Sequence, residues 1–187
     1  MPRSDDLYSL PPDLPVPVDD GACDHLAGAV VPSVGLVSTA GDMVDLSVIS
    51  GLAVVYAYPR TGRPDADPPA GWDLIPGMRG CTPQSCAFRD HYAEIRSWGA
   101  ELFGLSTQSP DYQREAAERL HLPFPLLSDE SLQLTRKMRL PTVEIGGMTL
   151  LKRFTLIIRD GQVAHCLYPV FPPDKNSEQV ISWLRSR

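Results

Sequence analysis

The fold and the chemistry of this chain are decided by residues 80–90, which read Gly-Cys-Thr-Pro-Gln-Ser-Cys-Ala-Phe-Arg-Asp. They follow a loop rich in proline and glycine. Pro83 suits the first turn of a helix, because its ring fixes φ and its missing N–H would have no intrahelical partner there. Apolar side chains then recur at helical spacing until Gly99, at Phe88, Tyr92, Ile95 and Trp98. The pattern predicts an amphipathic helix with Cys81 at its N-terminus.

A cysteine in that position is a candidate nucleophile, because unpaired N–H groups and the helix dipole stabilise a thiolate. Cys86 follows five residues later, inside the predicted helix. In an ideal helix this spacing separates the two residues by about 7.5 Å along the axis and turns their side chains apart. A disulfide tolerates Cα separations up to about 6.8 Å. The two cysteines can therefore bond only if the start of the helix unwinds, which predicts a redox switch.

Other segments appear around this motif in a recognisable order. An apolar run, Leu52–Tyr58, ends in Tyr58-Pro59 before it, and three segments follow it: Leu102-Phe103-Gly104-Leu105-Ser106, Leu122-Pro123-Phe124-Pro125-Leu126-Leu127-Ser128-Asp129 and Arg153-Phe154-Thr155-Leu156-Ile157-Ile158. Together with Cys-Thr-Pro-Gln-Ser-Cys-Ala-Phe-Arg-Asp, these segments resemble the Q-type peroxiredoxins, also called bacterioferritin comigratory proteins. The resemblance covers roughly Val34 to the last residue and is far more specific than a lone two-cysteine motif.

The resemblance implies a thiol-dependent peroxidase for hydrogen peroxide and organic hydroperoxides. In that family the first cysteine, here Cys81, is peroxidatic and becomes a sulfenic acid, and the one five residues on, here Cys86, resolves it as a disulfide. A thioredoxin-type donor then recycles the enzyme. Arg153 matches the active-site arginine, with Lys152 as the neighbour that faces the other side of a strand. Cys23 and Cys166 are the alternative resolving residues, although core packing suits Cys166 better.

The sequence departs from the family in front of Cys81. The usual approach is Pro-x-x-x-Thr/Ser-x-x-Cys, but Leu74 and Met78 occupy the two corresponding positions. Pro59 matches the family's proline, displaced by an insertion from about 60 to 80. The hydroxyl that would bind the peroxide is therefore unassigned, with Thr61 or a backbone group as candidates. Within the insertion, Trp72 either fixes the loop to the body of the protein or walls the peroxide pocket, and burial statistics favour the first.

Two other functions remain open at this point. A thiol–disulfide oxidoreductase on the same fold would normally use a Cys-x-x-Cys pair, which this sequence lacks. A redox-sensing or partner-binding domain would use the Cys81–Cys86 disulfide only to change shape. No flavin, haem or nicotinamide motif is present, so we expect no cofactor. Cys23 and His25 have no second Cys/His pair nearby at ligand spacing, and an ordinary loop is favoured there over a metal site.

Composition places the protein among ordinary globular domains. It has 187 residues, 43% of them hydrophobic and 21% charged, and a net charge of −6. The absence of a basic stripe argues against nucleic acid as a partner, and no apolar run reaches the length of a membrane span. The acids and prolines of residues 1–6 differ from a signal peptide. We therefore expect a cytoplasmic protein, without a nucleic-acid or membrane partner, and a monomer.

The remaining pattern predicts the fold. Residues 1–33 form a Pro/Asp-rich arm, and residues 34–187 one thioredoxin-like α/β domain. Its central mixed β-sheet has helices on both faces and an N-terminal β-hairpin. The predicted strands are 34–38, 43–47, 52–58, 100–106, 126–127, 142–145, 148–158 and 162–168. The predicted helices are that beginning at Thr82 or Pro83, one from Pro110 to about His121 capped by Ser109, one from Ser128 or Asp129 to about Met138, and one from about Asp174.

Overall fold

The computed structural model describes residues 6–187. Residues 1–5, part of the acidic start that argues against a signal peptide, lie outside the described residues. The main structure is a seven-stranded mixed sheet in the order β2-β1-β5-β4-β3-β8-β9. β3 pairs in parallel with β4 and β4 with β5, and the other neighbours are antiparallel. Its strands are β1 (Gly35–Ser38), β2 (Met43–Asp45), β3 (Leu52–Ala57), β4 (Ala100–Ser106), β5 (Leu126–Ser128), β8 (Phe154–Arg159) and β9 (Gln162–Leu167).

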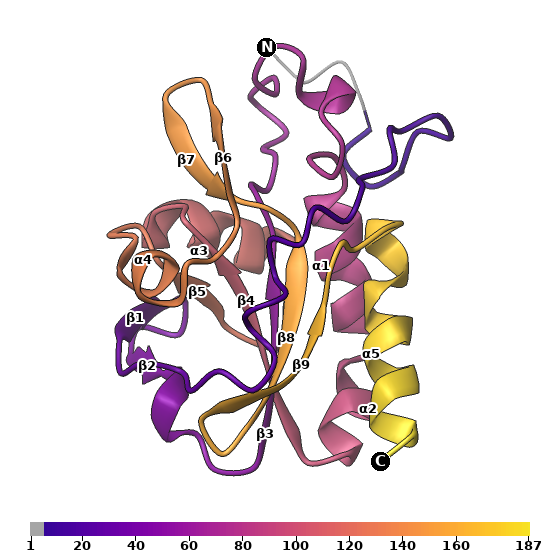
Figure 1. Ribbon diagram of the computed structural model, residues 1–187. Helices are drawn as coiled ribbons and strands as arrows, with labels where there is room; N and C mark the ends of the chain where they lie inside the picture. Colours follow the sequence, from indigo (N-terminus) through magenta and orange to yellow (C-terminus); the bar gives the residue numbers. More distant parts are fainter. Residues whose placement is uncertain (1–5) are drawn as a thin grey trace.

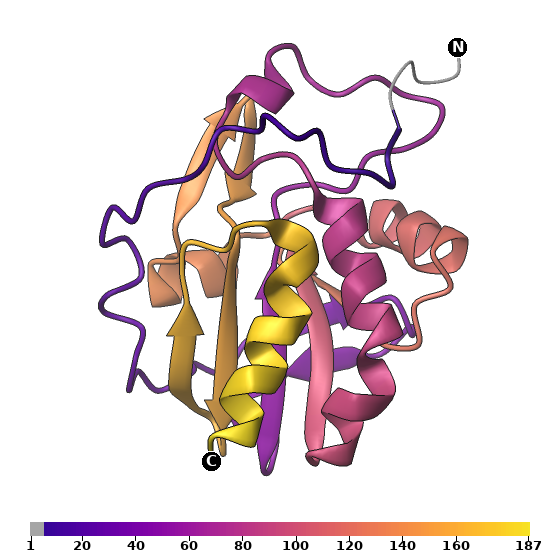
Figure 2. The same cartoon turned by 90° about the vertical axis from the view of Figure 1, so that its right-hand side faces the viewer.

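Helices cover both faces of this sheet, because alternate side chains of the central strands are buried on opposite sides. On one face Val54 and Tyr56 pack with Phe88, Ala116 and Val180. That face therefore carries four helices: α1 (Cys81–Asp90), α2 (Tyr92–Ser97), α3 (Pro110–Arg119) and α5 (Asn176–Arg185). In Figure 2 the yellow α5 and the magenta α1 stand side by side in front of the sheet.

The opposite face is covered by α4 (Gln133–Met138) together with the N-terminal arm. Ala53 and Val55, which alternate with the residues above, pack there with Leu134 of α4 and with Leu26 and Val31 of the arm. The predictions of a mixed sheet with helices on both faces and of an N-terminal hairpin, β1–β2, are confirmed. Short 3₁₀ turns lie at Leu46–Val48, Trp72–Leu74 and Pro173–Lys175.

The first predicted helix is not continuous. It breaks at His91, which leaves helical geometry (φ −99°, ψ 6°), so α1 and α2 are separate helices. Trp98 is 41% exposed after the end of α2 and does not extend the buried face, so that part of the prediction was wrong. The helical period continued across the break, and the pattern therefore could not reveal it.

The predicted strand 148–158 is also interrupted. β7 (Met148–Leu151) forms a separate two-stranded sheet with β6 (Thr142–Ile145), as Figure 1 shows, and β8 begins only at Phe154. Lys152 and Arg153 lie between the two strands and belong to neither. The amide of Lys152 donates to the carbonyl of Pro141, which closes the hairpin at this point. Arg153 is thus placed in a link between two sheets, where its side chain can turn toward α1.

The third predicted helix begins later than expected. Leu132 adopts left-handed geometry (φ +58°), so α4 starts at Gln133. The carboxylate of Asp129 nevertheless accepts the amides of Leu134 and Thr135, at 3.1 and 2.7 Å. Asp129 therefore satisfies donors at the start of α4 from a position several residues before it. Ser109 caps α3 as predicted, accepting from the amide of Tyr112.

Candidate active site

Cys81 is the first residue of α1, which confirms the predicted position of this thiol. Gly80 before it has φ +106° and supplies no side-chain cap to the helix. A Cβ at Gly80 would lie 2.8 Å from Leu10 of the arm and 2.8 Å from Pro173. The close fit of three segments around this glycine buries Cys81, which is 3% exposed. Cys81 therefore stands at the positive end of the α1 dipole, held away from bulk water, and its thiol donates to the carbonyl of Met78 at 3.7 Å.

Arg153 is the cation beside this thiol. Its Nη2 donates to Cys81 Sγ at 3.2 Å and to the carbonyls of Met78 and Arg79, each at 3.2 Å. The side chain is only 2% exposed, so the guanidinium acts in a low-dielectric setting. Lys152, the alternative weighed from the sequence, is partly exposed and pairs instead with Asp20 at 2.6 Å. The structure thus brings Cys81 and Arg153 together and turns Lys152 away.

A buried polar network fixes the direction of Arg153. Its Nη1 donates to Gln84 Oε1, and Gln84 Nε2 donates to Asn176 Oδ1 at 2.9 Å. Thr155 Oγ1 donates to the same Asn176 oxygen at 2.7 Å. Gln84 and Asn176 were missed by the sequence analysis. The signal for Gln84 was present, because it lies four residues before Phe88 and therefore on the buried face of α1.

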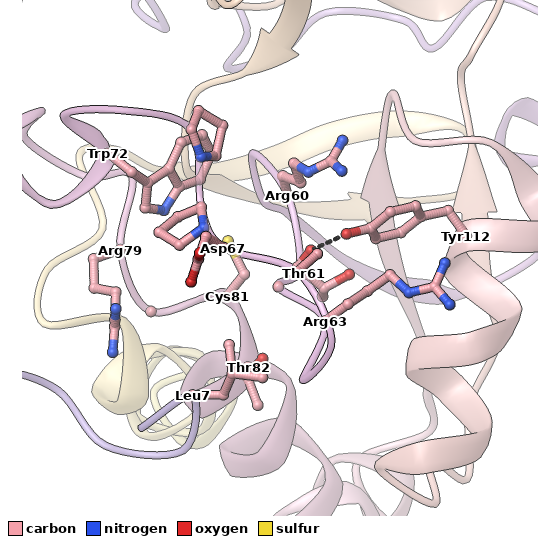
Figure 3. A pocket seen from close by; sticks show the side chains of 15 residues that line it. Leu7, Arg60, Thr61, Arg63, Asp67, Trp72, Arg79, Cys81, Thr82 and Tyr112 are labelled. Atoms are coloured by element: carbon pink, nitrogen blue, oxygen red, sulfur yellow. Dashed lines mark hydrogen bonds between the residues drawn. The ribbon is translucent and has the colours of Figure 1, made fainter. Parts of the chain in front are cut away.

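A small pocket opens above Cys81 (Figure 3). Its volume is about 40 Å³, and a cavity needs roughly 10–15 Å³ to hold one water molecule, so it has room for a molecule of two heavy atoms. Arg60, Arg63 and Arg79 lie on its wall, opposed by Asp67. The insertion between β3 and α1 supplies most of this lining, and two of its arginines are ion-paired, Arg63 with Asp65 and Arg79 with Asp73, each at 3.3 Å.

Trp72 in that insertion serves both of the purposes considered from the sequence. It is 6% exposed and packs against Met78, Ile145 and Leu150, so it fixes the loop to the β6–β7 hairpin. It also lines the Cys81 pocket, as Figure 3 shows. The preference for one role over the other was therefore unnecessary.

Thr61 is the threonine that follows Pro59 by two residues, and it lines the same pocket as Cys81. Both its amide and its Oγ1 donate to Gln108 Oε1, at 3.1 and 3.2 Å. Its carbonyl accepts from the hydroxyl of Tyr112 at 3.2 Å. Thr61 is fully buried, and its amide, hydroxyl and carbonyl each make a hydrogen bond, so its hydroxyl has a defined place at the pocket.

Thr82 brings a second hydroxyl to the pocket lining. Within residues 6–187, its Oγ1 is buried without a hydrogen-bond partner. Of the two hydroxyls, that of Thr61 is oriented by protein contacts and that of Thr82 is not.

Cys86 lies one and a half turns further along α1 and is half-buried. Burial raises the pKa of its thiol, an effect that Asp90 adds to and Arg89 opposes. Since α1 is helical from Cys81 to Asp90, the two cysteines stay apart while the helix is intact, as the spacing predicted. Arg89, in the same helix, makes structural contacts to Asp90 at 2.9 Å and to the carbonyl of Leu120 at 3.0 Å.

Cys23 and Cys166 lie elsewhere. Both belong to the core on the α4 face of the sheet, whereas Cys81 packs in the core on the opposite face. His91, at the end of α1, contacts the carbonyl of Ala87 and the hydroxyl of Ser177. These placements leave Cys86 as the cysteine that shares a helix with Cys81.

Comparison with known proteins agrees with this site. The family model described as Redoxin matches residues 26–181, most of the chain. A chloroplastic peroxiredoxin Q of Gentiana triflora is 32% identical over 96% of this chain and 78% of its own length. The chain is a Q-type peroxiredoxin. It is therefore a thiol-dependent peroxidase, and the family expected from the motif is confirmed.

Further relatives support the same placement of this peroxiredoxin. Peroxiredoxin Bcp of Escherichia coli (strain K12) is 29% identical over 85% of this chain and 95% of its own. The solved structure of peroxidoxin BcpB from Mycobacterium tuberculosis superimposes with a TM-score of 0.68 at 25% identity, covering 86% of this chain and 96% of that one. The thioredoxin-like fold is thereby confirmed. Within the described part of the chain, no helix has the length and apolar character needed to cross a bilayer.

Proposed function

We propose that Cys81 is the peroxidatic residue of this peroxidase, that Arg153 stabilises its thiolate and the transition state, and that Cys86 resolves the product. The observation that carries the proposal is the 3.2 Å contact between Arg153 Nη2 and Cys81 Sγ. This contact lies beside a pocket large enough for a hydroperoxide group. Because the thiolate is the reactive form of cysteine, a buried cation beside it favours the species that attacks.

In the first step the Cys81 thiolate attacks the terminal oxygen of the hydroperoxide and the O–O bond breaks. Sulfur gains the oxygen as a sulfenic acid, and the remaining oxygen leaves as an alkoxide or hydroxide that takes up a proton. Negative charge moves from sulfur to the leaving oxygen during this step. Arg153 holds a fixed positive charge at the sulfur, where it favours the attacking thiolate over the thiol.

Thr61 is the residue we propose for the hydroxyl that the family motif would place before the cysteine. Its donor bond to Gln108 leaves the oxygen's lone pairs available to accept the hydrogen of the hydroperoxide. Thr82, whose oxygen lacks a fixed orientation, is the less suitable of the two. The insertion separates Thr61 from Cys81 in sequence, and the shared pocket is what supports the assignment.

Resolution requires a conformational change. The start of α1 must unwind so that the Cys86 thiolate can attack the sulfenic sulfur, expelling hydroxide and forming the Cys81–Cys86 disulfide. The helix cannot accommodate this bond, because its spacing exceeds the limit for a disulfide. Gly80 supplies no side-chain cap and lies in an already left-handed conformation, features suited to local unwinding.

The finer properties belong to the same proposal. We propose hydrogen peroxide and organic hydroperoxides as substrates, a thioredoxin-type dithiol as reductant, a monomer as the active form and the cytoplasm as its location. One of the matching solved structures, from Xanthomonas campestris, concerns alkyl peroxide reduction by a bacterioferritin comigratory protein. We also propose that residues 34–187 are the enzyme domain and residues 1–33 an arm, since the first strand begins at Gly35.

The test is peroxide consumption with a dithiol reductant by wild type, Cys81→Ser, Cys86→Ser and, as matched control, Cys166→Ser, with mass spectrometry of each oxidised chain. Cys81→Ser is expected to lose turnover. Cys86→Ser should still reduce one equivalent of peroxide and accumulate oxygen on Cys81, and Cys166→Ser should match wild type. A Cys81 that stays reduced in the Cys86→Ser variant while another thiol gains oxygen would refute the proposal.

A further inference from the structure

The N-terminal arm lies along β9, the edge strand of the sheet, at two places (Figures 1 and 2). At one, the amide of Gly28 donates to the carbonyl of Val163 at 2.8 Å, and the amide of Val163 donates to Ala29 at 2.9 Å. At the other, the hydroxyl of Tyr168 donates to Asp20 Oδ1 at 2.7 Å. The arm therefore runs antiparallel to β9 and is held at both ends of this section.

Cys23 lies between the two attachments on the arm, and Cys166 lies between them on β9. Antiparallel progression from the Asp20–Tyr168 contact toward the Gly28–Val163 contact brings the two cysteines opposite each other. Both face the same core: Cys23 is buried in it at 6% exposure, and Cys166 packs against it half-buried. The Cys166 thiol lies near enough to Cys23 to raise, together with burial, the pKa of the Cys23 thiol. Both are free thiols.

This pair has no part in the peroxidase reaction proposed above. It lies on the α4 face of the sheet, and Cys81 lies on the other. Two free thiols placed opposite each other, on segments far apart in the sequence, are nevertheless a site at which oxidation can join the chain to itself.

We propose that Cys23 and Cys166 form a second redox pair, which a hydroperoxide oxidises to a disulfide that fastens the N-terminal arm to β9. Cys166 is the more accessible thiol and reacts first. Its thiolate takes the terminal oxygen of the hydroperoxide to become a sulfenic acid, releasing the alcohol or water. The Cys23 thiol then attacks this sulfur, and water leaves. In sum, one hydroperoxide and two thiols give one disulfide, one alcohol or water, and one further water.

The bond would secure a segment that builds the active site. The part of the arm before Cys23 reaches the active site. There Leu7 lines the Cys81 pocket, Leu10 packs beside Gly80 and Pro17 lies beside Gly77. A covalent anchor at Cys23 restricts detachment of this segment, because the arm can then leave β9 only as far as the disulfide allows. Peroxide stress would thereby hold the wall of the peroxide pocket in place.

The experiment uses the full chain with the double substitution Cys81→Ser/Cys86→Ser, treated with hydrogen peroxide or, separately, with the thiol-specific oxidant diamide. Non-reducing peptide mapping by mass spectrometry is expected to find the peptide that contains Cys23 joined to the peptide that contains Cys166, with the loss of two hydrogens. The same joined peptide is expected in oxidised wild type, which controls for misfolding of the double variant. Adding the Cys23→Ser substitution to the double variant should abolish the joined peptide. Cys166 should then be recovered with oxygen added to its sulfur.

A second measurement tests the mechanical consequence. The oxidised Cys81→Ser/Cys86→Ser variant should unfold at a higher temperature than the same variant when reduced, and a dithiol should reverse this rise. Once Cys23 is also replaced, oxidation should produce no such rise. Thiols that remain alkylatable after peroxide, or that join only under diamide, would overturn the proposal. The choice of a hydroperoxide as oxidant rests on the proposed function. Failure of the Cys23–Cys166 proposal can nevertheless be told from failure of the proposed function, because the double variant lacks the peroxidatic thiol and peroxide consumption by wild type is measured separately.

Discussion

Arg153 Nη2 donates to Cys81 Sγ at 3.2 Å, although 72 residues separate the two in sequence. The contact exists because the β6–β7 hairpin ends at Leu151 and β8 begins at Phe154, which leaves Arg153 in the link between them. A residue within a regular strand would have a side-chain direction fixed by the sheet. The interruption between β7 and β8 is thus the structural feature that lets Arg153, which belongs to neither strand, reach the start of α1.

Replacing Arg153 with methionine is expected to lower kcat/KM for hydrogen peroxide by about 10²–10³-fold, the size of loss seen when one fixed active-site donor is removed, because the Cys81 thiolate loses the cation beside it. Lys152→Met is the matched control, because that lysine forms a partly exposed pair with Asp20 and such pairs contribute little. Stopped-flow peroxide consumption measures both. Equal rates for the Arg153→Met variant and wild type would contradict the assigned role.

Gln84 orients Arg153 without touching the thiol, so it is a positioning residue. Gln84→Met should lower the free energy of unfolding by about 1–3 kcal/mol, because buried groups of Arg153 and Asn176 lose their partner. Gln84→Glu keeps an acceptor for Arg153 as a carboxylate but replaces the donor to Asn176 with a second acceptor, so it should lower both kcat/KM and stability. Urea unfolding and steady-state kinetics separate the two effects. Gln133→Met, on the exposed side of α4, is the control and should change neither.

Thr61→Val removes the hydroxyl proposed to bind the hydroperoxide and keeps the side-chain shape. A hydrogen bond between neutral groups is worth about 0.5–1.5 kcal/mol, so kcat/KM should fall roughly 2–10-fold. Thr61→Ser should retain most of the rate. Thr82→Val is a useful contrast, since its hydroxyl is unpartnered among the described residues and its loss should not lower stability. A larger kinetic loss in Thr82→Val than in Thr61→Val would reverse the assignment of the two threonines.

Disulfide formation should accelerate with rising pH. Burial raises the pKa of Cys86 in the folded helix, so the thiol is protonated at neutral pH and the thiolate fraction grows as pH increases. The folded helix holds the Cys86 proton more tightly than the unfolded chain does, because the pKa of Cys86 is raised in the folded state. Its contribution to helix stability is therefore complete below the pKa of an unfolded cysteine, about 8.5, and decreases as pH rises above it. Both effects favour resolution at alkaline pH. Stopped-flow fluorescence between pH 6 and 9 should show the resolving phase quicken, and Cys86→Ser should lack that phase.

Gly80→Ala is expected to destabilise the protein more than Gly99→Ala. Both glycines have positive φ, +106° and +74°, and an alanine there costs about 1–3 kcal/mol. Only at Gly80 would the new Cβ also collide with Leu10 and Pro173, whereas nothing lies within 4 Å at Gly99. Chemical denaturation of the two variants compares the costs. Equal losses would show that the arm and Pro173 yield easily around the start of α1.

Much of the fold was predictable because local patterns determine it. The apolar run of β3, the cap at Ser109 and the proline in the first turn of α1 each depend on neighbouring residues, and each was read correctly. Continuations were predicted less well: the break at His91 and the end of β7 at Leu151 interrupt apolar patterns that run on without a signal. Backbone geometry at such points is set by what packs around them, which a single sequence does not contain.

By itself, the sequence determined that a thiol would stand at a helix N-terminus with a second one too far along the helix to bond to it, since both statements follow from spacing alone. Only the tertiary structure decided which arginine reaches that thiol, that Gln84 and Asn176 orient it, that Thr61 shares its pocket, and that Cys23 meets Cys166. Each of these contacts joins segments that are distant along the chain. Their distances depend on how the sheet, the insertion and the arm pack together, and no local pattern encodes that packing.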